Sequence, residues 1–245
     1  MKRLIIVVLL IADSLVAQAQ KLTFEYNAGF GSYGMSGMKD LLGSVQPGLN
    51  QVKTIDNFPG YLTHDMRIGF EWKRHQWGYL FDYMNTAGKK GVSDYSGDYS
   101  LAMRIKGYKI GLFYRYTLAD TPVGKLRLQP YLEMSSGTIL NNVKMKESLH
   151  FNVSGTPTPE YTPGTEEELK FTGPNFFLAP AIGARLKLCS YAAINLSIGY
   201  EWDALKSLYL DGDKDKKLTQ KADWSGFRVQ GGLIFYFPLG KNNYK

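Results

Sequence analysis

Eight segments of this 245-residue chain alternate between large apolar residues and small or polar residues with a period of two. This is the period of a β-strand, in which successive side chains point to opposite faces. The eight predicted strands are 21–30, 61–73, 77–87, 101–117, 125–139, 175–188, 193–205 and 227–238. In the last one, FRVQGGLIFYFP, the apolar face carries Phe227, Val229, Leu233, Phe235 and Phe237. Helical periodicity is nearly absent, so the sequence predicts an all-β fold.

Long and short connections between these strands alternate along the chain. The links after the second, fourth and sixth strands are short, at 74–76, 118–124 and 189–192. The links after the first, third, fifth and seventh strands are long, at 32–60, 88–100, 141–170 and 206–223. Outer-membrane barrels have short periplasmic turns at one end and long extracellular loops at the other. A soluble β-sandwich has no reason to sort its loops in this way.

Side-chain volume decides which face of the strands points inward. The interior of an eight-stranded barrel is barely wide enough to be filled by side chains. The apolar face is rich in Phe, Tyr, Trp, Leu, Ile and Met, which such an interior cannot hold, whereas the opposite face is mostly Gly, Ser, Asn and Thr with scattered charges. The sequence therefore predicts an eight-stranded antiparallel up-and-down transmembrane β-barrel with its apolar face toward lipid.

Aromatic residues gather near the predicted strand ends, as they do at the two lipid–water interfaces of membrane barrels. The predicted aromatic girdle consists of Trp72, Trp77, Tyr79, Phe235 and Phe237 at the short-turn end, and Trp202 and Trp224 at the other.

Three local irregularities are expected. The alternation in the fourth strand changes phase near Lys106-Gly107, which predicts a β-bulge. Pro130 and Pro180 fall within the fifth and sixth strands, where each removes a backbone donor, so a local bulge is expected at each as well.

The first 19 residues have the pattern of a cleaved secretory signal peptide. Basic Lys2 and Arg3 precede an apolar run that is too short to span a bilayer, and Ala17-Gln18-Ala19 offers a cleavage site. We therefore expect residues 20–245 to form one barrel domain in the outer membrane of a Gram-negative cell. The single cysteine, Cys189, excludes an internal disulfide framework.

The stretches YNAGFGSYGM, YLEMSSG, LAPAIGARLKL and GGLIFYFPLG resemble outer-membrane β-barrel domain proteins of the OmpA/OmpX-like type, particularly those of the Bacteroidetes. PorT-like secretion-associated barrels share the same general pattern. The resemblance implies a cell-envelope protein that is inserted by the outer-membrane insertion machinery. Such barrels commonly end on an aromatic residue, whereas eight residues follow Phe237 here.

Charged residues on the inward face form a predicted ion network in the lumen. Its members are Glu25, Asp65, Arg67, Glu71, Asp82, Arg115, Arg127, Glu133, Arg185, Glu201, Asp203 and Arg228. Such a network either gates an ion path or plugs the lumen with mutually paired charges. We favour the plug, because the barrel is narrow.

No catalytic, cofactor-binding or metal-binding site is predicted. Among the three histidines, His64 alone lies near the long-loop end of a strand, and no serine and acid converge on it. The stretch DGDKDK begins like a calcium loop, but its twelfth position is Ala222 instead of glutamate.

The long loops are the remaining candidates for function. Met38, Leu41 and Leu42 of the first loop are predicted to share one side of a short helix at the barrel mouth. Lysines of the fourth loop, Lys206, Lys214, Lys216 and Lys217, are suited to lipopolysaccharide phosphates.

We therefore expect a non-enzymatic protein with a structural or surface-recognition role through its long loops. The expected partners are outer-membrane lipid, lipopolysaccharide, and a surface ligand or envelope protein, but not nucleic acid. A small gated pore and the barrel component of a secretion system are alternatives, and an enzyme of lipid A modification is a remote one.

Overall fold

The computed structural model describes residues 21–44, 53–94, 97–151, 165–204, 208–211 and 213–239. The predicted signal peptide and Lys206 lie outside this part of the chain. It contains one helix, α2 (Ser36–Ser44). The strands are β1 (Lys21–Gly31), β2 (Lys53–Asn57), β3 (Tyr61–Trp72), β4 (His75–Asp94), β5 (Gly97–Thr117), β6 (Thr121–Val123), β7 (Leu126–Phe151), β8 (Thr165–Lys187), β9 (Ala192–Ala204), β10 (Leu208–Leu210), β11 (Asp213–Leu218) and β12 (Gly226–Pro238).

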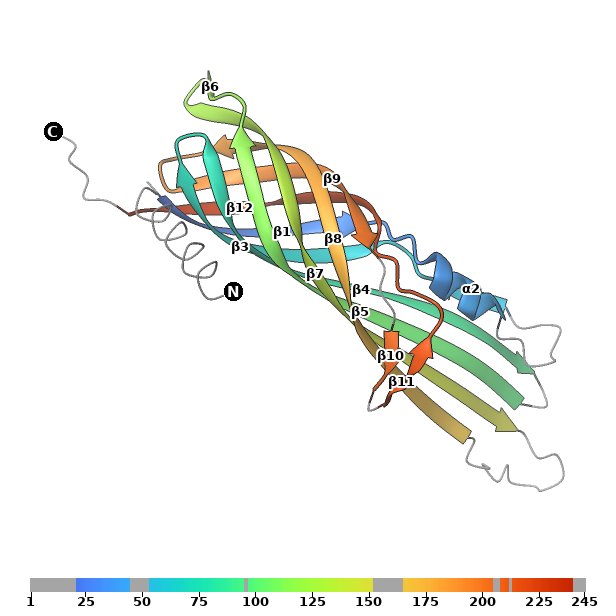
Figure 1. Ribbon diagram of the computed structural model, residues 1–245. Coiled ribbons are helices and arrows are strands. Elements are labelled where there is room, and N and C mark those ends of the chain that lie inside the picture. The colour runs from blue at the N-terminus through green and yellow to red at the C-terminus, as the bar shows by residue number, and fades with distance from the viewer. Residues whose placement is uncertain are drawn as a thin grey trace, which may run out of the picture.

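Eight of these strands form a closed antiparallel ring. Its order is β1-β3-β4-β5-β7-β8-β9-β12, and β12 pairs back onto β1 over eleven residue pairs from Lys21↔Pro238 to Gly31↔Arg228. Figure 1 shows the strands wrapping around one axis, with short turns at one end of the ring. The predicted fold class and all eight strands are confirmed. Closure leaves no free edge within the ring, which removes the usual liability of an open sheet.

The two faces of the ring have opposite chemistry. Inward positions are buried and largely polar, as with Glu25, Asn27 and Arg115, whereas outward positions are apolar and exposed. Ile68, Leu196 and Phe227, for example, expose 53%, 62% and 62% of their surface. An exposed apolar band of this kind is the lipid-facing surface of a membrane barrel. Within the described residues, no helix is long and apolar enough to cross a membrane.

The bulge that the sequence predicts at Lys106-Gly107 is absent. β5 pairs with β4 from Asp94↔Gly97 to His75↔Tyr116, and with β7, without any shift in register. Odd-numbered residues of β5 point inward along its whole length, including buried Ile105 and Phe113. The apolar residues change face near Lys106 because the outer face of β5 is apolar within the ring, whereas its inner face is apolar beyond it. The backbone pairing is the same on both sides of this point.

The two prolines are also accommodated without bulges. Pro130 and Pro180 pair with Ala184 and Met134 in one continuous β7–β8 register. Between β8 and β9 the pairing stops after Leu178↔Trp202 and resumes with unchanged offset at Ala181↔Gly199. Pro180 therefore costs ladder bonds at this place and leaves the register intact.

Two of the predicted long loops are in fact extended strands. β4, β5, β7 and β8 continue past the ring as a four-stranded sheet, which we call the protruding sheet (88–94, 97–106, 141–151 and 165–174; Figure 1). Its edges are covered in part, since β2 pairs with β4, and β10 pairs with β8. The prediction of loops was wrong for 88–94, 97–100, 141–151 and 165–170, which pair as strands with a buried inner face that includes Tyr99 and Val143. The remaining residues of the two predicted loops lie outside the described part of the chain.

Candidate functional site

The middle of the lumen is held together by Arg115. Its guanidinium lies 3.0 Å from Glu25 Oε2 and 2.7 Å from Glu133 Oε2, and all three side chains are almost completely buried. Arg67 bridges the same Glu133 at 2.6 Å and Asp65 at 2.6 Å. Strand pairing places these charges together, because Arg115 is opposite Glu133 and Glu25 is opposite Arg67.

A second cluster closes the lumen at the short-turn end. Arg185 Nη1 lies 2.8 Å from Glu71 Oε2, and its Nη2 donates a 2.6 Å hydrogen bond to Thr117 Oγ1. Lys187 adds a second cation 3.7 Å from Glu71 Oε1. Gln76 shares its side-chain oxygen between Arg185 and Arg115, which connects this cluster with the middle one.

A third cluster lies toward the long-loop end. Lys109 Nζ is 2.6 Å from Glu201 Oε2 and 3.6 Å from Asp82 Oδ2. Arg228 Nη2 lies 3.1 Å from the other oxygen of Glu201. Lys109 was not among the predicted network residues, although the alternation of β5 places it on the same inward face as Arg115.

These ion pairs balance one another and fill the lumen. The carboxylates are Glu25, Asp65, Glu71, Asp82, Glu133 and Glu201. The cations are Arg67, Lys109, Arg115, Arg185, Lys187 and Arg228. The cavity among Arg67, Glu133, Lys109 and Glu201 has a volume of about 30 Å³, which accommodates about one or two water molecules.

An apolar cap covers the lumen at the long-loop end. Trp224, from the connection before β12, is fully buried and lies against Gly107, where a Cβ would be 3.0 Å from the indole. Its Nε1 donates a 2.6 Å hydrogen bond to Asn141 Oδ1 on β7. Tyr33 meets the Trp224 ring edge-on at 4.8 Å. Gly107 therefore provides the space in which the cap meets the barrel wall.

The segment after β1, which contains the predicted helix α2, completes this cap. Met38 and Leu42 of α2 are buried, which confirms the expected helix and its apolar side. Phe58 packs where Gly88 leaves room for its ring. The backbone N–H of Met35 donates a hydrogen bond to the carbonyl of Asp223. This bond joins the segment after β1 directly to the segment before β12.

The structure places ten of the twelve predicted network residues in the buried interior. Asp203 lies half-buried at the rim, where its Oδ2 accepts hydrogen bonds from Asn175 and from the backbone of Trp224. The prediction for Arg127 was wrong: this residue is exposed and pairs with Asp120 at 2.7 Å. Arg127 has the alternation of an inward residue, but the pairing of β7 with β5 ends at Tyr131, and at Arg127 the strand pairs with β6 instead.

The prediction of Trp224 as a girdle residue was also wrong. Trp224 has no exposed surface and belongs to the cap, because residues before Gly226 turn inward over the lumen. Outward positions hold Tyr79, Trp202, Phe235 and Phe237, with 68%, 53%, 41% and 52% of their surface exposed.

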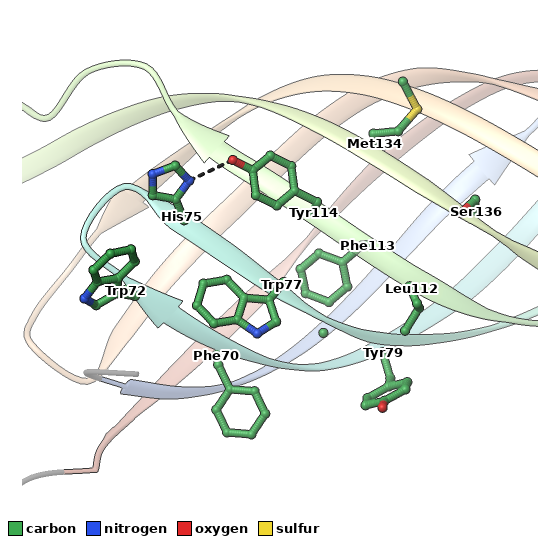
Figure 2. A pocket seen from close by; sticks show the side chains of 11 residues that line it. Phe70, Trp72, His75, Trp77, Tyr79, Leu112, Phe113, Tyr114, Met134 and Ser136 are labelled. Atoms are coloured by element: carbon green, nitrogen blue, oxygen red, sulfur yellow. Dashed lines mark hydrogen bonds between the residues drawn. The ribbon is translucent and has the colours of Figure 1, made fainter. Parts of the chain in front are cut away.

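Trp72 and Trp77 line a groove on the outer surface near the short turns. The groove has a volume of about 740 Å³, and its walls include Tyr79, Tyr114 and Met134. Figure 2 shows these side chains projecting from neighbouring strands, with His75 Nδ1 hydrogen-bonded to the Tyr114 hydroxyl at 2.7 Å. Because the groove opens on the apolar exterior, it belongs to the lipid-facing surface.

The candidates for chemistry remain dispersed. His64 is exposed and hydrogen-bonded to the Tyr26 hydroxyl at 2.9 Å. No group of three or more His, Cys, Asp or Glu residues suited to a metal ion occurs within the described part of the chain. Of the fourth-loop lysines, Lys216 lies 3.4 Å from Asp213.

Comparison with known proteins gives structural likenesses only. No protein-family model matches the chain, and no curated protein is significantly similar to it in sequence. Neisserial surface protein A is similar in structure over 88% of this chain and 97% of its own, with 12% identity and a TM-score of 0.40. The outer-membrane protein OprG of Pseudomonas aeruginosa is similar over 90% and 97%, with 11% identity and a TM-score of 0.41. Ail of Yersinia pestis is similar over 89% and 97%, with 12% identity and a TM-score of 0.33. Because these sequence identities and TM-scores are low, the description of the barrel rests on the strand pairing given above and not on these likenesses.

Proposed function

We propose that this chain is a non-enzymatic outer-membrane protein whose barrel is a closed anchor and whose protruding sheet is a recognition surface outside the cell. The observation that carries the proposal is that the lumen is filled and capped while the sheet extends beyond it. Six carboxylates and six cations pair within the interior, and Trp224, Met38 and Leu42 cover it.

The location follows from the exterior of the ring. Its outward residues form an exposed apolar band, which is costly in water and favourable in lipid. The two-residue Lys73-Arg74 turn and the other short connections lie at one end, which we place in the periplasm, as in other membrane barrels. The protruding sheet is then extracellular.

A closed anchor has two measurable properties. In detergent gels the unheated protein should migrate differently from the boiled protein, because a closed barrel resists the detergent. In planar lipid bilayers the isolated protein should give no discrete conductance steps. Identical migration would contradict the barrel, and well-defined single-channel steps would favour the small gated pore instead.

The recognition role requires a separate experiment. Intact cells that display the parent protein should capture its surface ligand, and a variant without residues 88–106 of the protruding sheet should not. A matched variant with Lys125→Gln in a short turn keeps the outer surface intact. Equal capture by the parent and the deletion variant would refute recognition by this sheet.

A further inference from the structure

The outward face of the protruding sheet carries a cluster of cations, which we call the basic row. Its members are Lys89, Arg104, Lys106, Lys144, Lys146 and Lys170. The strand register aligns three of them directly across three strands, since Arg104 pairs with Lys144, and Lys144 pairs with Lys170. Neighbouring strands are about 4.8 Å apart, so like charges that face each other in this way destabilise the sheet.

Glu168 partly compensates the charge of Lys144 and Lys170 in the row. Glu168 Oε1 lies 3.3 Å from Lys144 Nζ and 3.4 Å from Lys170 Nζ, and hydrogen bonds from these two lysines hold the pKa of Glu168 below its ordinary value. All three side chains remain 45% exposed. The aligned cations Arg104, Lys144 and Lys170 outnumber Glu168 and therefore keep a positive excess toward solvent, in contrast to the balanced pairs of the lumen.

The position of the row relative to the apolar band indicates what it meets. On β5, Tyr108 and Ile110 are the last large apolar residues that point outward, and Lys106 and Arg104 follow on the same face. Two residues advance about 7 Å along a strand, so Arg104 lies about 14 Å beyond Tyr108 and somewhat less along the membrane normal because the strands are tilted. This is the depth of the lipid headgroups and the layer just outside them.

The structure assigns to the basic row the binding of a phosphorylated glycolipid of the outer leaflet, with the phosphates on Arg104, Lys144 and Lys170 and the acyl chains on the apolar band below. This inference rests on the proposed membrane location and orientation, and it names a ligand class for the protruding sheet. A lipid is favoured over a free polyanion because the row continues directly into exposed apolar residues, Tyr108 and Ile110 on β5 and Leu140 on β7. Only a ligand with both phosphates and acyl chains matches both parts of this surface.

The test compares two triple variants with equal loss of charge. The first, Arg104→Gln/Lys144→Gln/Lys170→Gln, removes the aligned cations. The second, Lys73→Gln/Arg74→Gln/Lys125→Gln, removes three exposed cations from the short-turn end. Retention of diphosphoryl lipid A is measured by native mass spectrometry of the folded barrel released from mixed micelles.

We expect the first variant to bind diphosphoryl lipid A about a hundredfold more weakly than the parent, at roughly fivefold for each cation near the headgroups. The second variant should stay within about twofold of the parent, since its charges lie at the other end of the barrel. Dephosphorylated lipid A should bind the parent and the first variant equally.

Four results would overturn this inference. Equal retention of diphosphoryl lipid A by the parent and the first variant would refute the proposed site. An equal loss of retention in both variants would refute it as well. Equally tight binding of a soluble polyphosphate that lacks acyl chains would show that the row serves a free polyanion. A chain that fails to insert into vesicles would refute the membrane location itself, whereas an inserted barrel without this preference would refute the glycolipid site alone.

Discussion

The indole nitrogen of Trp224 donates a 2.6 Å hydrogen bond to the side-chain oxygen of Asn141, which joins the connection before β12 to the wall of the barrel. Both side chains are buried, and Asn141 also donates to the carbonyl of Gly173 on the neighbouring strand. The bond therefore fixes the cap to β7 and β8 at the place where the lumen ends and the protruding sheet begins.

Trp224→Phe should loosen this cap while leaving the ring intact. The substitution leaves the buried Asn141 oxygen without its donor, which costs about 1–3 kcal/mol. We expect trypsin to cleave the connection before β12 faster in this variant, with unchanged heat-dependent gel migration. Trp202→Phe, an exposed position, is the control, and an equal increase in cleavage there would contradict the role of the bond.

Arg115→Met should be strongly destabilising. It leaves Glu25 and Glu133 buried without one of their cations, and breaking a buried ion pair from one side costs about 3–5 kcal/mol. Unfolding by urea in lipid vesicles measures the change. Arg127→Met removes an exposed pair with Asp120 and should cost less than about 1 kcal/mol. Similar losses in both variants would argue against a structural role for the lumen network.

Labels placed along β5 should locate the membrane boundary. In a Cys189→Ser background, a spin label at Leu112→Cys should be relaxed by oxygen dissolved in lipid. A label at Ala102→Cys, on the same outward face but in the protruding sheet, should respond to a water-soluble nickel complex. If both labels respond to oxygen alike, the change of phase near Lys106 does not mark the membrane surface.

Gly88→Ala and Gly43→Ala should have opposite effects on stability. A Cβ at Gly88 would lie 2.6 Å from the Phe58 ring, so overpacking should cost about 1–3 kcal/mol. A Cβ at Gly43 in α2 meets nothing within 4 Å and should contribute about 0.5–1 kcal/mol through helix propensity. The urea midpoints of the two variants test both signs, and a neutral Gly88→Ala would show that the first connection is not packed on β4 as described.

The lumen residues were largely predictable because a strand has only two faces. Once volume assigns the apolar face to the outside, residues such as Glu25, Arg67 and Arg115 can only point inward. Alternation alone cannot tell where the pairing of β5 with β7 ends, so Arg127 was assigned to the lumen although its side chain is exposed at the rim. Lys109 was predictable by the same alternation and was overlooked among its apolar neighbours.

The sequence by itself determined the eight strands of the ring, the short connections between them and the direction of most of their side chains, because these depend on local alternation. Only the tertiary structure decided that strands β4, β5, β7 and β8 continue past the ring. Their inner face carries apolar residues that become buried only when the cap packs against them. The tertiary structure also decided that Trp224 lies inside, and that Arg104, Lys144 and Lys170 stand side by side. These residues are far apart along the chain, and pairing between strands, which local pattern does not encode, brings them together.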